Sequence, residues 1–459
     1  MTLLPSTPAS VAAAVVTSAD GGRIFASTPV RVVTPGTAAD VVVILHPDRP
    51  RQTIVGFGAS LTESSAAALR TLPATQRTAL LTELFSPTDG LGLSLLRQPL
   101  GGSEFVSGSH FTYDDIPIGR RDFALDHFSL GRDGTTVLPL VRQARQISGR
   151  LTIIGTPWSA PAWMKAGDSL VGGRLRTGTA YEQAYVDYLV RTVGAYRDAG
   201  VPLDYLTLQN EPMYSPPDYP GMPMTAWQQI RLITALAPAL SAQGLPTRLL
   251  GYDHNWRTGD DMVRTLLASS AAPHLAGLAF HCYAGQPSDM RAFADATPML
   301  MVTECSGSAA AGDSAAKRFS DTLGWHARNL VIDSIAAGSS SVVTWNLALD
   351  EDNGPHRGGC STCSGVVTVD SRTAAITRNA EYYTLGHLSR YVDPGAVRFD
   401  ADRSGRDTVT AVAFDNPGGQ RVVVLYSQDG RARTVNLQDG DRTLQVTIPA
   451  RSLATVTIP

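Results

Sequence analysis

The sequence has little of what marks a disulfide-rich, nucleic-acid-binding or membrane-spanning protein. Only 4 of its 459 residues are cysteine, too few for a disulfide scaffold. The formal net charge is −3, and Lys165 and Lys317 are the only lysines, so the composition indicates no nucleic-acid partner and no binding to an anionic membrane. No stretch approaches the roughly 18 uninterrupted apolar residues of a membrane-spanning helix.

The N-terminus also lacks the pattern of a signal peptide. The first basic residue is Arg23, and the apolar run from Ala9 to Val16 is poorly flanked. Two localisations therefore stay open: cytoplasmic, or secreted with a signal already removed. The preference for arginine over lysine, together with abundant alanine, is typical of a GC-rich bacterial genome.

The four cysteines are interpreted as two pairs. Cys282 and Cys305 each lie at the end of an expected strand, and we expect both to be buried thiols. Cys360 and Cys363 lie in a Gly-rich loop, where a short-range disulfide and two free thiols are equally open. Zinc is the least favoured alternative, because only His356 is near enough in sequence to be a further ligand. We expect this second pair to be structural and peripheral.

The central region repeats one pattern, an apolar run followed by a loop and an amphipathic helix. The runs are continuous rather than alternating, which is typical of parallel strands covered on both faces. We expect strands at Thr53–Ser60, Ser94–Leu100, Leu151–Ser159, Asp204–Pro212, Thr247–Asn255, Leu275–Ala284, Met299–Ser306 and Ser340–Leu349. Helical spacing of apolar residues predicts helices over Tyr181–Ala199, Gln229–Leu240 and Ala315–Ala337.

Eight such strand–helix units in roughly 330 residues predict an α/β fold, a (β/α)₈ TIM barrel with loop insertions. The alternative is a doubly wound open sheet, but no Gly-x-Gly-x-x-Gly follows an early strand.

The two ends of the chain differ from the centre. Short strands with Gly and Asp turns are expected after residue 389, and similar strands precede residue 50. We expect residues 1–50 and 389–459 to build one small antiparallel β-sandwich, with the catalytic barrel, residues 51–388, inserted between them. The expected strands are Arg31–Val33, Val41–Leu45, Val409–Phe414, Arg421–Tyr426, Thr434–Leu437, Thr443–Ile448 and Leu453–Ile458.

Two glutamates stand at the ends of buried strands. Glu211 ends the fourth expected strand, and Glu304 ends the seventh. A carboxylate in such a place is costly unless it is paired or used. One alone would suggest a structural acid, but two in matching positions across a barrel mouth favour glycoside hydrolysis. Carboxyl groups about 5 Å apart predict retention of configuration, and about 6.5–9.5 Å predicts inversion.

Other strand ends carry suitable partners for these carboxylates. Arg97 can orient and ionise a nucleophilic carboxylate. His281 and Tyr283 end the strand beside Glu304, where a phenol can hydrogen-bond that carboxylate. Trp158 and Trp345 can stack on sugar rings. Each of these residues alone would also fit core packing or a buried ion pair, but their shared place at strand C-termini favours a site.

Several motifs follow one another between about residue 50 and residue 390. They are Gly56-Phe57-Gly58-Ala59-Ser60, Leu96-Arg97-Gln98-Pro99, Ser103-Glu104-Phe105, Pro157-Trp158-Ser159-Ala160-Pro161, Gln209-Asn210-Glu211-Pro212, His281-Cys282-Tyr283, Thr303-Glu304-Cys305 and Trp345-Asn346-Leu347. By these motifs the chain resembles glycoside hydrolase family 30, which includes lysosomal glucosylceramidase and the endo-β-1,6-glucanases.

The resemblance implies roles for the site residues. Glu211 would be the general acid/base and Glu304 the nucleophile, so we expect the pKa of Glu211 to exceed that of Glu304. Asn210 would hold the sugar 2-hydroxyl, while Glu104, Trp158 and Trp345 would line the sugar subsite. The glucosylceramidase branch has aspartate in place of Glu104. The mechanism requires no metal and no organic cofactor.

The expected function is therefore hydrolysis of β-glucosidic bonds in a β-linked glycoside or oligosaccharide, by double displacement. Glucosylceramidase-like and β-1,6-glucanase-like activities both fit. The alternatives are a β-xylosidase, β-fucosidase or β-galactanase relative, and a catalytically silent carbohydrate-binding protein. Intact carboxylates at both positions favour an enzyme.

Overall fold

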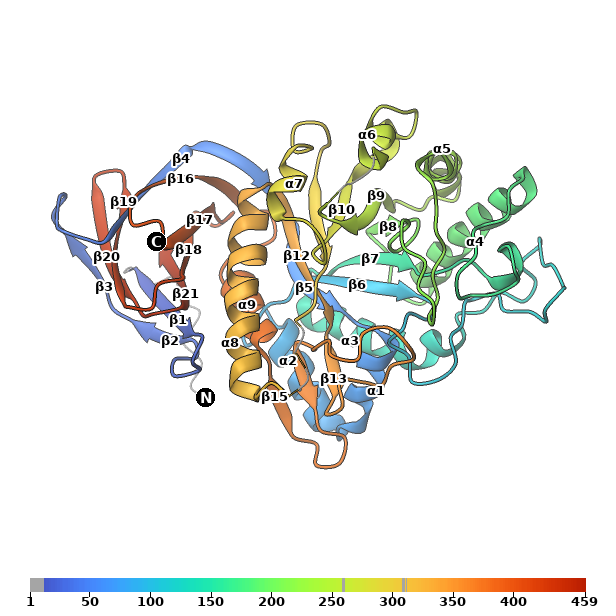
Figure 1. Cartoon of the computed structure of the whole chain (residues 1–459), viewed down its shortest axis with the longest axis horizontal. Helices are drawn as coiled ribbons and strands as arrows, with labels where there is room; N and C mark the ends of the chain where they lie inside the picture. The colour runs from blue at the N-terminus through green and yellow to red at the C-terminus, as the bar shows by residue number, and fades with distance from the viewer. Residues whose placement is uncertain (1–11, 258–260, 308–309, 311) are drawn as a thin grey trace.

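The computed structural model describes residues 12–257, 261–307, 310 and 312–459. Residues 1–10, on which much of the interpretation of the N-terminus depends, lie outside the described residues, as does residue 11. Figure 1 shows a barrel and a separate β domain lying side by side. No helix in the described ranges has both the length and the apolar character needed to cross a membrane.

The barrel contains all eight expected strands in chain order. Its strands are all parallel, and it closes where β12 pairs with β5. The TIM-barrel prediction is therefore confirmed. The strands are β5 (Gly56–Ser60), β6 (Leu95–Leu100), β7 (Thr152–Pro157), β8 (Tyr205–Thr207), β9 (Arg248–Asn255), β10 (Leu275–His281), β11 (Leu300–Glu304) and β12 (Ser339–Asn346).

Strand β8 is shorter than expected. The strand ends at Thr207, and the following residues are held by single backbone hydrogen bonds at the ends of the neighbouring strands. There the backbone N–H of Asn210 donates to the carbonyl of Pro157, and that of Glu211 donates to the carbonyl of Asp253. These bonds hold the expected catalytic segment against the ends of β7 and β9.

An apolar layer fills the inside of the barrel. Seven strands each contribute one buried side chain to it, so the barrel is a packed core and not a pore. The layer consists of Leu95, Ile154, Tyr205, Leu250, Ala279, Met301 and Val343.

Helices cover the outside of the barrel. All three predicted helices are present. The first corresponds to α4 (Thr179–Asp198), the second to α5 (Ala226–Ala242), and the third to α8 (Ala315–His326) with its continuation η4 (Ala327–Ser334). The helices within the described residues are α1 (Glu63–Thr71), α2 (Ala74–Phe85), η1 (Asp133–Val137), α3 (Leu138–Ser148), η2 (Ala162–Met164), α4 (Thr179–Asp198), α5 (Ala226–Ala242), α6 (Met262–Leu267), η3 (Ala272–His274), α7 (Pro287–Arg291), α8 (Ala315–His326), η4 (Ala327–Ser334) and α9 (Ala380–Ser389).

After β12 the chain forms a small additional sheet that is not among the elements expected from the sequence. Its strands are β13 (Ala348–Asp350), β14 (Val367–Val369) and β15 (Ile376–Arg378). The loop between β13 and β14 carries Cys360 and Cys363.

Both ends of the chain build the β domain. Its ten strands form one sheet in the order β2-β1-β21-β18-β17-β16-β4-β19-β20-β3, antiparallel except between β4 and β19. The N-terminal strands are β1 (Ala13–Ser18), β2 (Ala26–Thr28), β3 (Val30–Val33) and β4 (Val41–Thr53). The C-terminal strands are β16 (Val397–Gly405), β17 (Val409–Asp415), β18 (Arg421–Ser427), β19 (Arg433–Asp439), β20 (Arg442–Ile448) and β21 (Ser452–Ile458).

Closure of the barrel requires a glycine at position 58. A Cβ atom on Gly58 would lie 1.7 Å from the carbonyl oxygen of Leu95, its partner on β6. Because the obstacle is backbone, we expect Gly58→Ala to lower the free energy of unfolding by about 3 kcal/mol, the upper end of the usual cost of overpacking, measured by urea unfolding. Gly194→Ala in α4 is the control, since its Cβ would meet no atom within 4 Å and alanine favours helix by about 1 kcal/mol. Equal stability of the two variants would contradict this account.

Candidate active site

The C-terminal ends of the barrel strands surround a cavity of about 540 Å³. Its size is within the range of small-molecule sites. Most of the expected site residues line it, and Arg97 and His281 lie in contact with them. The cavity is lined by Glu104, Trp158, Asn210, Glu211, Met213, Tyr214, Tyr219, His254, Asn255, Tyr283, Glu304, Ser306, Trp345, Cys360, Thr362 and Cys363.

Glu304 ends β11 and is held at both carboxylate oxygens. Nη1 of Arg97 lies 2.5 Å from Oε2, and the hydroxyl of Tyr283 donates to Oε1 at 2.9 Å. Arg97 is completely buried on β6. A charge-assisted bond to a fixed guanidinium restricts rotation of the carboxylate. Glu304 therefore presents a carboxylate of defined orientation to the cavity.

Glu211 is held differently. Its backbone has φ of +46°, in the left-handed region, a conformation that costs on the order of 1–3 kcal/mol and is concentrated at functional sites. Its Oε1 atom lies 3.1 Å from Nδ1 of His281 and 3.7 Å from Nδ1 of His254. Glu211 therefore contacts imidazoles, whereas Glu304 contacts a guanidinium and a phenol.

The two glutamates converge on one point. One carboxylate oxygen of Glu211, one of Glu304 and one ring nitrogen of His281 lie within 4.8 Å of one another. Such spacing could also suit a metal ion. A metal ion here would have to lie close to the Arg97 guanidinium, which already contacts Glu304, so the charges favour carboxylate chemistry over cation binding.

Asp253 is a central residue of the site that is not among the residues expected from the sequence. It is buried on β9 and contacts Nη2 of Arg97 at 3.1 Å and Nε2 of His281 at 3.0 Å. The hydroxyls of Thr207 and Thr303 also donate to it, at 2.8 and 3.0 Å. Burial alone would raise the pKa of Asp253, but the charges of Arg97 and His281 hold it well below its usual value. The signal in the sequence that could have identified Asp253 is an acidic residue near the C-terminal end of a buried strand.

The pKa order of the two glutamates differs from the expectation. Burial opposes charge on His281, but Glu304 and Asp253 outweigh it and raise the pKa of His281 to about 9. Burial would raise the pKa of Glu211, yet the hydrogen bond and charge of His281 bring it below its usual value. Burial dominates at Glu304 and raises its pKa. The prediction of a higher pKa for Glu211 is thus wrong for the unliganded protein.

The two tryptophans pack on each other. Trp158 and Trp345 stack with ring centroids 5.0 Å apart and an interplanar angle of 14°, and the Arg97 guanidinium lies 4.9 Å from the Trp158 centroid. Each indole therefore gives one face to its neighbour, which leaves less aromatic surface for a sugar than expected. The indole N–H of Trp345 donates to Oε1 of Glu104 at 2.9 Å. Nη2 of Arg97 donates to Oδ1 of Asn210 at 2.7 Å.

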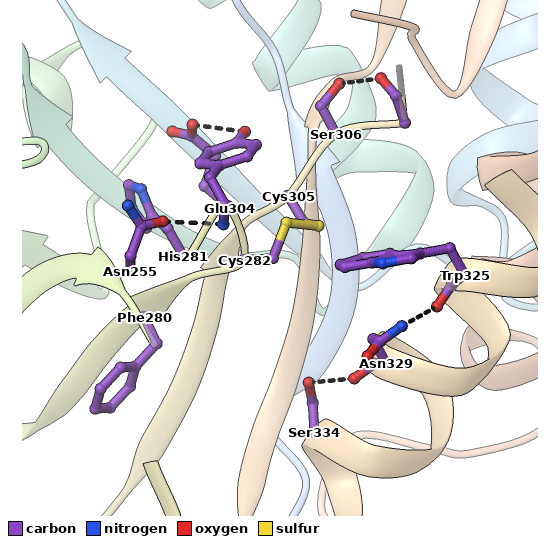
Figure 2. The surroundings of a disulfide bond; sticks show 12 residues. Asn255, Phe280, His281, Cys282, Glu304, Cys305, Ser306, Trp325, Asn329 and Ser334 are labelled. Atoms are coloured by element: carbon purple, nitrogen blue, oxygen red, sulfur yellow. Dashed lines mark hydrogen bonds between the residues drawn. A yellow bond between two sulfur atoms is a disulfide. The ribbon is translucent and has the colours of Figure 1, made fainter. Parts of the chain in front are cut away.

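Cys282 and Cys305 form a disulfide, so the prediction of buried thiols is wrong. Strands β10 and β11 pair His281 with Glu304, and the next residue on each strand is a cysteine. Their Cα atoms lie 5.2 Å apart, a spacing that suits a disulfide. Figure 2 shows this bond between the two strand ends, with His281 and Glu304 on one side and Trp325 on the other.

Cys360 and Cys363 also form a disulfide, one of the two alternatives left open by their spacing. Both residues line the cavity, and Cys363 packs with Phe105, Trp158 and Trp345. The expectation of a peripheral position is therefore wrong, because the loop after β13 folds back over the barrel mouth.

The barrel and its paired carboxylates are those of a glycoside hydrolase. Residues 54–392 match the glycosyl hydrolase family 30 TIM-barrel domain, and residues 395–456 match the β-sandwich domain of the same family. The chain belongs to glycosyl hydrolase family 30 and is an enzyme that hydrolyses O-glycosyl bonds, as the resemblance implied.

The chain is similar to several known proteins along most of its length. It is 32% identical to an endo-1,6-β-D-glucanase of Neurospora crassa, covering 94% of this chain and 92% of that protein. Identity to the lysosomal acid glucosylceramidase of Mus musculus is 26%, with 88% and 81% covered. A solved endo-β1,6-glucanase superposes with a TM-score of 0.88 at 28% identity, covering 97% of this chain and 98% of that one.

Glu104 gives the site a pH-dependent contribution to stability. Burial, together with the charge of Glu304, raises the pKa of Glu104 to about 8. Between about pH 4.5 and pH 8 the folded state then binds a proton that the unfolded state has lost, so this contribution weakens as pH rises. We expect the difference in unfolding free energy between wild type and Glu104→Gln to fall by a few kcal/mol between pH 5 and pH 8. That size corresponds to the difference between the folded and unfolded pKa values of Glu104.

The measurement is urea unfolding of both proteins at each pH. Glu104→Asp keeps a titrating carboxyl group and is the matched control, which should retain the pH dependence. A constant difference between wild type and Glu104→Gln would show that Glu104 does not titrate in this range.

Proposed function

We propose that this chain is a retaining β-glucosidase that cleaves β-1,6-linked glucan by double displacement. The observation that carries the proposal is the convergence of Glu211 and Glu304: one carboxylate oxygen of each lies within 4.8 Å of the other across the barrel mouth. Such closeness favours the roughly 5–5.5 Å carboxyl separation of retaining enzymes and leaves little room for a water between nucleophile and sugar.

In the first step, Glu304 attacks the anomeric carbon and Glu211 gives a proton to the leaving glycosidic oxygen. Arg97 and Tyr283 hold the attacking carboxylate in place. The one proton that the two glutamates share lies on Glu211 in this step, so that Glu304 is ionised; His281 contacts Glu211 and stays a cation. The products are a glycosyl ester on Glu304 and the released sugar or aglycone.

In the second step, Glu211 takes a proton from a water that attacks the same anomeric carbon. The C–O bond to Glu304 breaks, and the released sugar regains the β configuration after two inversions. Asn210, held by Arg97, is placed to bind the hydroxyl next to the reacting carbon.

Similarity to characterised enzymes supports a glucan substrate. Three relatives at 31–32% identity are endo-1,6-β-D-glucanases, and identity to the mouse glucosylceramidase is lower, at 26%. Met213 and Tyr214 are partly exposed at the rim of the cavity, where they offer surface to further sugar units. The two disulfides favour an oxidising compartment, the secreted alternative of the two localisations.

A substrate panel tests this proposal. We expect the protein to release short oligosaccharides from β-1,6-glucan at least about tenfold faster, by kcat/KM, than it hydrolyses glucosylceramide, β-1,3-glucan or β-xylan. Glu304→Gln is the control and should lose essentially all turnover while it keeps the wild-type circular dichroism spectrum. Preferential hydrolysis of glucosylceramide or xylan would reassign the substrate.

Removal of Glu211 should affect the two steps differently. Glu211→Ala still forms the glycosyl ester from an aryl β-glucoside with a good leaving group, but it lacks the base that activates water. Azide needs no base, so we expect it to raise turnover at least about tenfold and to yield β-glucosyl azide. The product is identified by NMR. Equal losses on good and poor leaving groups, without azide rescue, would remove Glu211 from the acid/base role.

A further inference from the structure

The Cys282–Cys305 disulfide lies next to the residues that hold Glu304. Cys305 directly follows Glu304, and Cys282 lies between His281 and Tyr283. His281 contacts Glu211, and the hydroxyl of Tyr283 donates to Glu304. One covalent bond thus joins the two chain segments that carry the nucleophile and its hydrogen-bond donor (Figure 2).

The β-ladder is irregular at this position. Phe280 pairs with Val302, but the next residue, His281, pairs with Glu304, so Thr303 is an extra residue on β11. A bulge of this kind bends a strand and interrupts the regular register. The pairing of β10 with β11 ends at His281 and Glu304, and the disulfide links the next residue on each strand. It therefore fixes the register beyond the bulge, where backbone pairing has stopped.

Tyr283 depends on that fixed register. Its side chain is at the cavity surface, and the residue is 45% exposed. Its backbone N–H donates to Oδ1 of Asn255 at 2.9 Å, and its hydroxyl donates to Oε1 of Glu304 at 2.9 Å. A half-exposed tyrosine loses rotamer freedom when it holds one hydroxyl in place. The disulfide ties the backbone of Tyr283 to β11 and so reduces this entropic cost, because Tyr283 and Glu304 each adjoin one of the bridged cysteines.

We propose that the Cys282–Cys305 disulfide is a positioning element for the nucleophile, holding Tyr283 against Glu304. This inference rests on the proposed function, in which Glu304 attacks the sugar. Without the disulfide, Arg97 still pairs with Glu304, but the second oxygen loses its donor and the carboxylate gains rotational freedom. Turnover then falls, while the sugar-binding wall of Trp158, Trp345 and Glu104 is unaffected.

A double-mutant cycle distinguishes positioning from plain stabilisation. We expect Cys282→Ala/Cys305→Ala to lower kcat on an aryl β-glucoside about tenfold, with KM changed less than about threefold, at a temperature where every variant is folded. Tyr283→Phe should lower kcat to a similar extent. If the disulfide acts through Tyr283, adding Tyr283→Phe to the disulfide-free protein should cost less than about twofold more.

Two further measurements keep the inference testable if the double alanine variant does not fold. Folded wild type is treated with a phosphine reductant, reduction at Cys282 and Cys305 is quantified by alkylation and mass spectrometry, and kcat should fall in proportion. Cys360→Ser/Cys363→Ser is treated in the same way, so that a loss in this background is assigned to the first disulfide.

A crystal structure of the disulfide-free or reduced protein is independent of the substrate. We expect the Tyr283 hydroxyl to lie beyond hydrogen-bond distance of Glu304. The inference is overturned if that contact persists, or if the effects of losing the disulfide and of Tyr283→Phe multiply independently. A wild-type protein inactive on every β-glucoside would refute the proposed function, and the crystal structure would still decide the positioning role.

Discussion

The buried guanidinium of Arg97 is the contact on which the site depends. A cation with no exposed surface is tolerated only when it is paired, and Arg97 contacts the carboxylates of Glu304 and Asp253 and the amide oxygen of Asn210. Those partners come from β11, from β9 and from the segment after β8. Arg97 therefore ties three strand ends to β6, and the packed barrel beneath them keeps the four positions in register.

The charges of this cluster explain how one proton can serve two glutamates. Arg97 and His281 are cations, and Asp253 is an anion. The cluster is therefore neutral when Glu211 and Glu304 share one proton, and it resists both full ionisation and full protonation of the pair. One carboxylate and one carboxylic acid are what double displacement requires. The contacts, rather than the unliganded pKa values, distinguish the two: Glu304 is held from two sides by Arg97 and Tyr283, whereas Glu211 contacts the imidazolium of His281.

Much of the fold could be predicted from the sequence, because it follows from local patterns. Continuous apolar runs alternating with helices indicate a parallel barrel, and the order of strands then places Glu211 and Glu304 at one mouth. The same order of strands places Arg97, His281 and Tyr283 next to these glutamates. The β domain could be predicted because short strands with an alternating apolar and polar pattern occur at both ends of the chain.

What could not be predicted depends on distances between segments that sequence spacing does not set. The disulfide of Cys282 and Cys305 depends on a β-bulge that shifts the strand register and pairs His281 with Glu304, so that the two cysteines follow paired residues. Asp253 was overlooked because its strand-end position was not connected with Arg97 and His281. The pKa order depends on which glutamate touches His281, and the folding of the Cys360–Cys363 loop over the cavity depends on the small sheet after β12.

The most direct test of this account is the configuration of the sugar at the moment of release. Hydrolysis of an aryl β-glucoside by wild type is followed by NMR of the anomeric proton during the first minutes, before mutarotation mixes the anomers. Attack by Glu304 followed by water on the same carbon predicts that the β anomer appears first. Initial appearance of the α anomer would contradict the central claim, since it would show that water, and not Glu304, attacks the sugar.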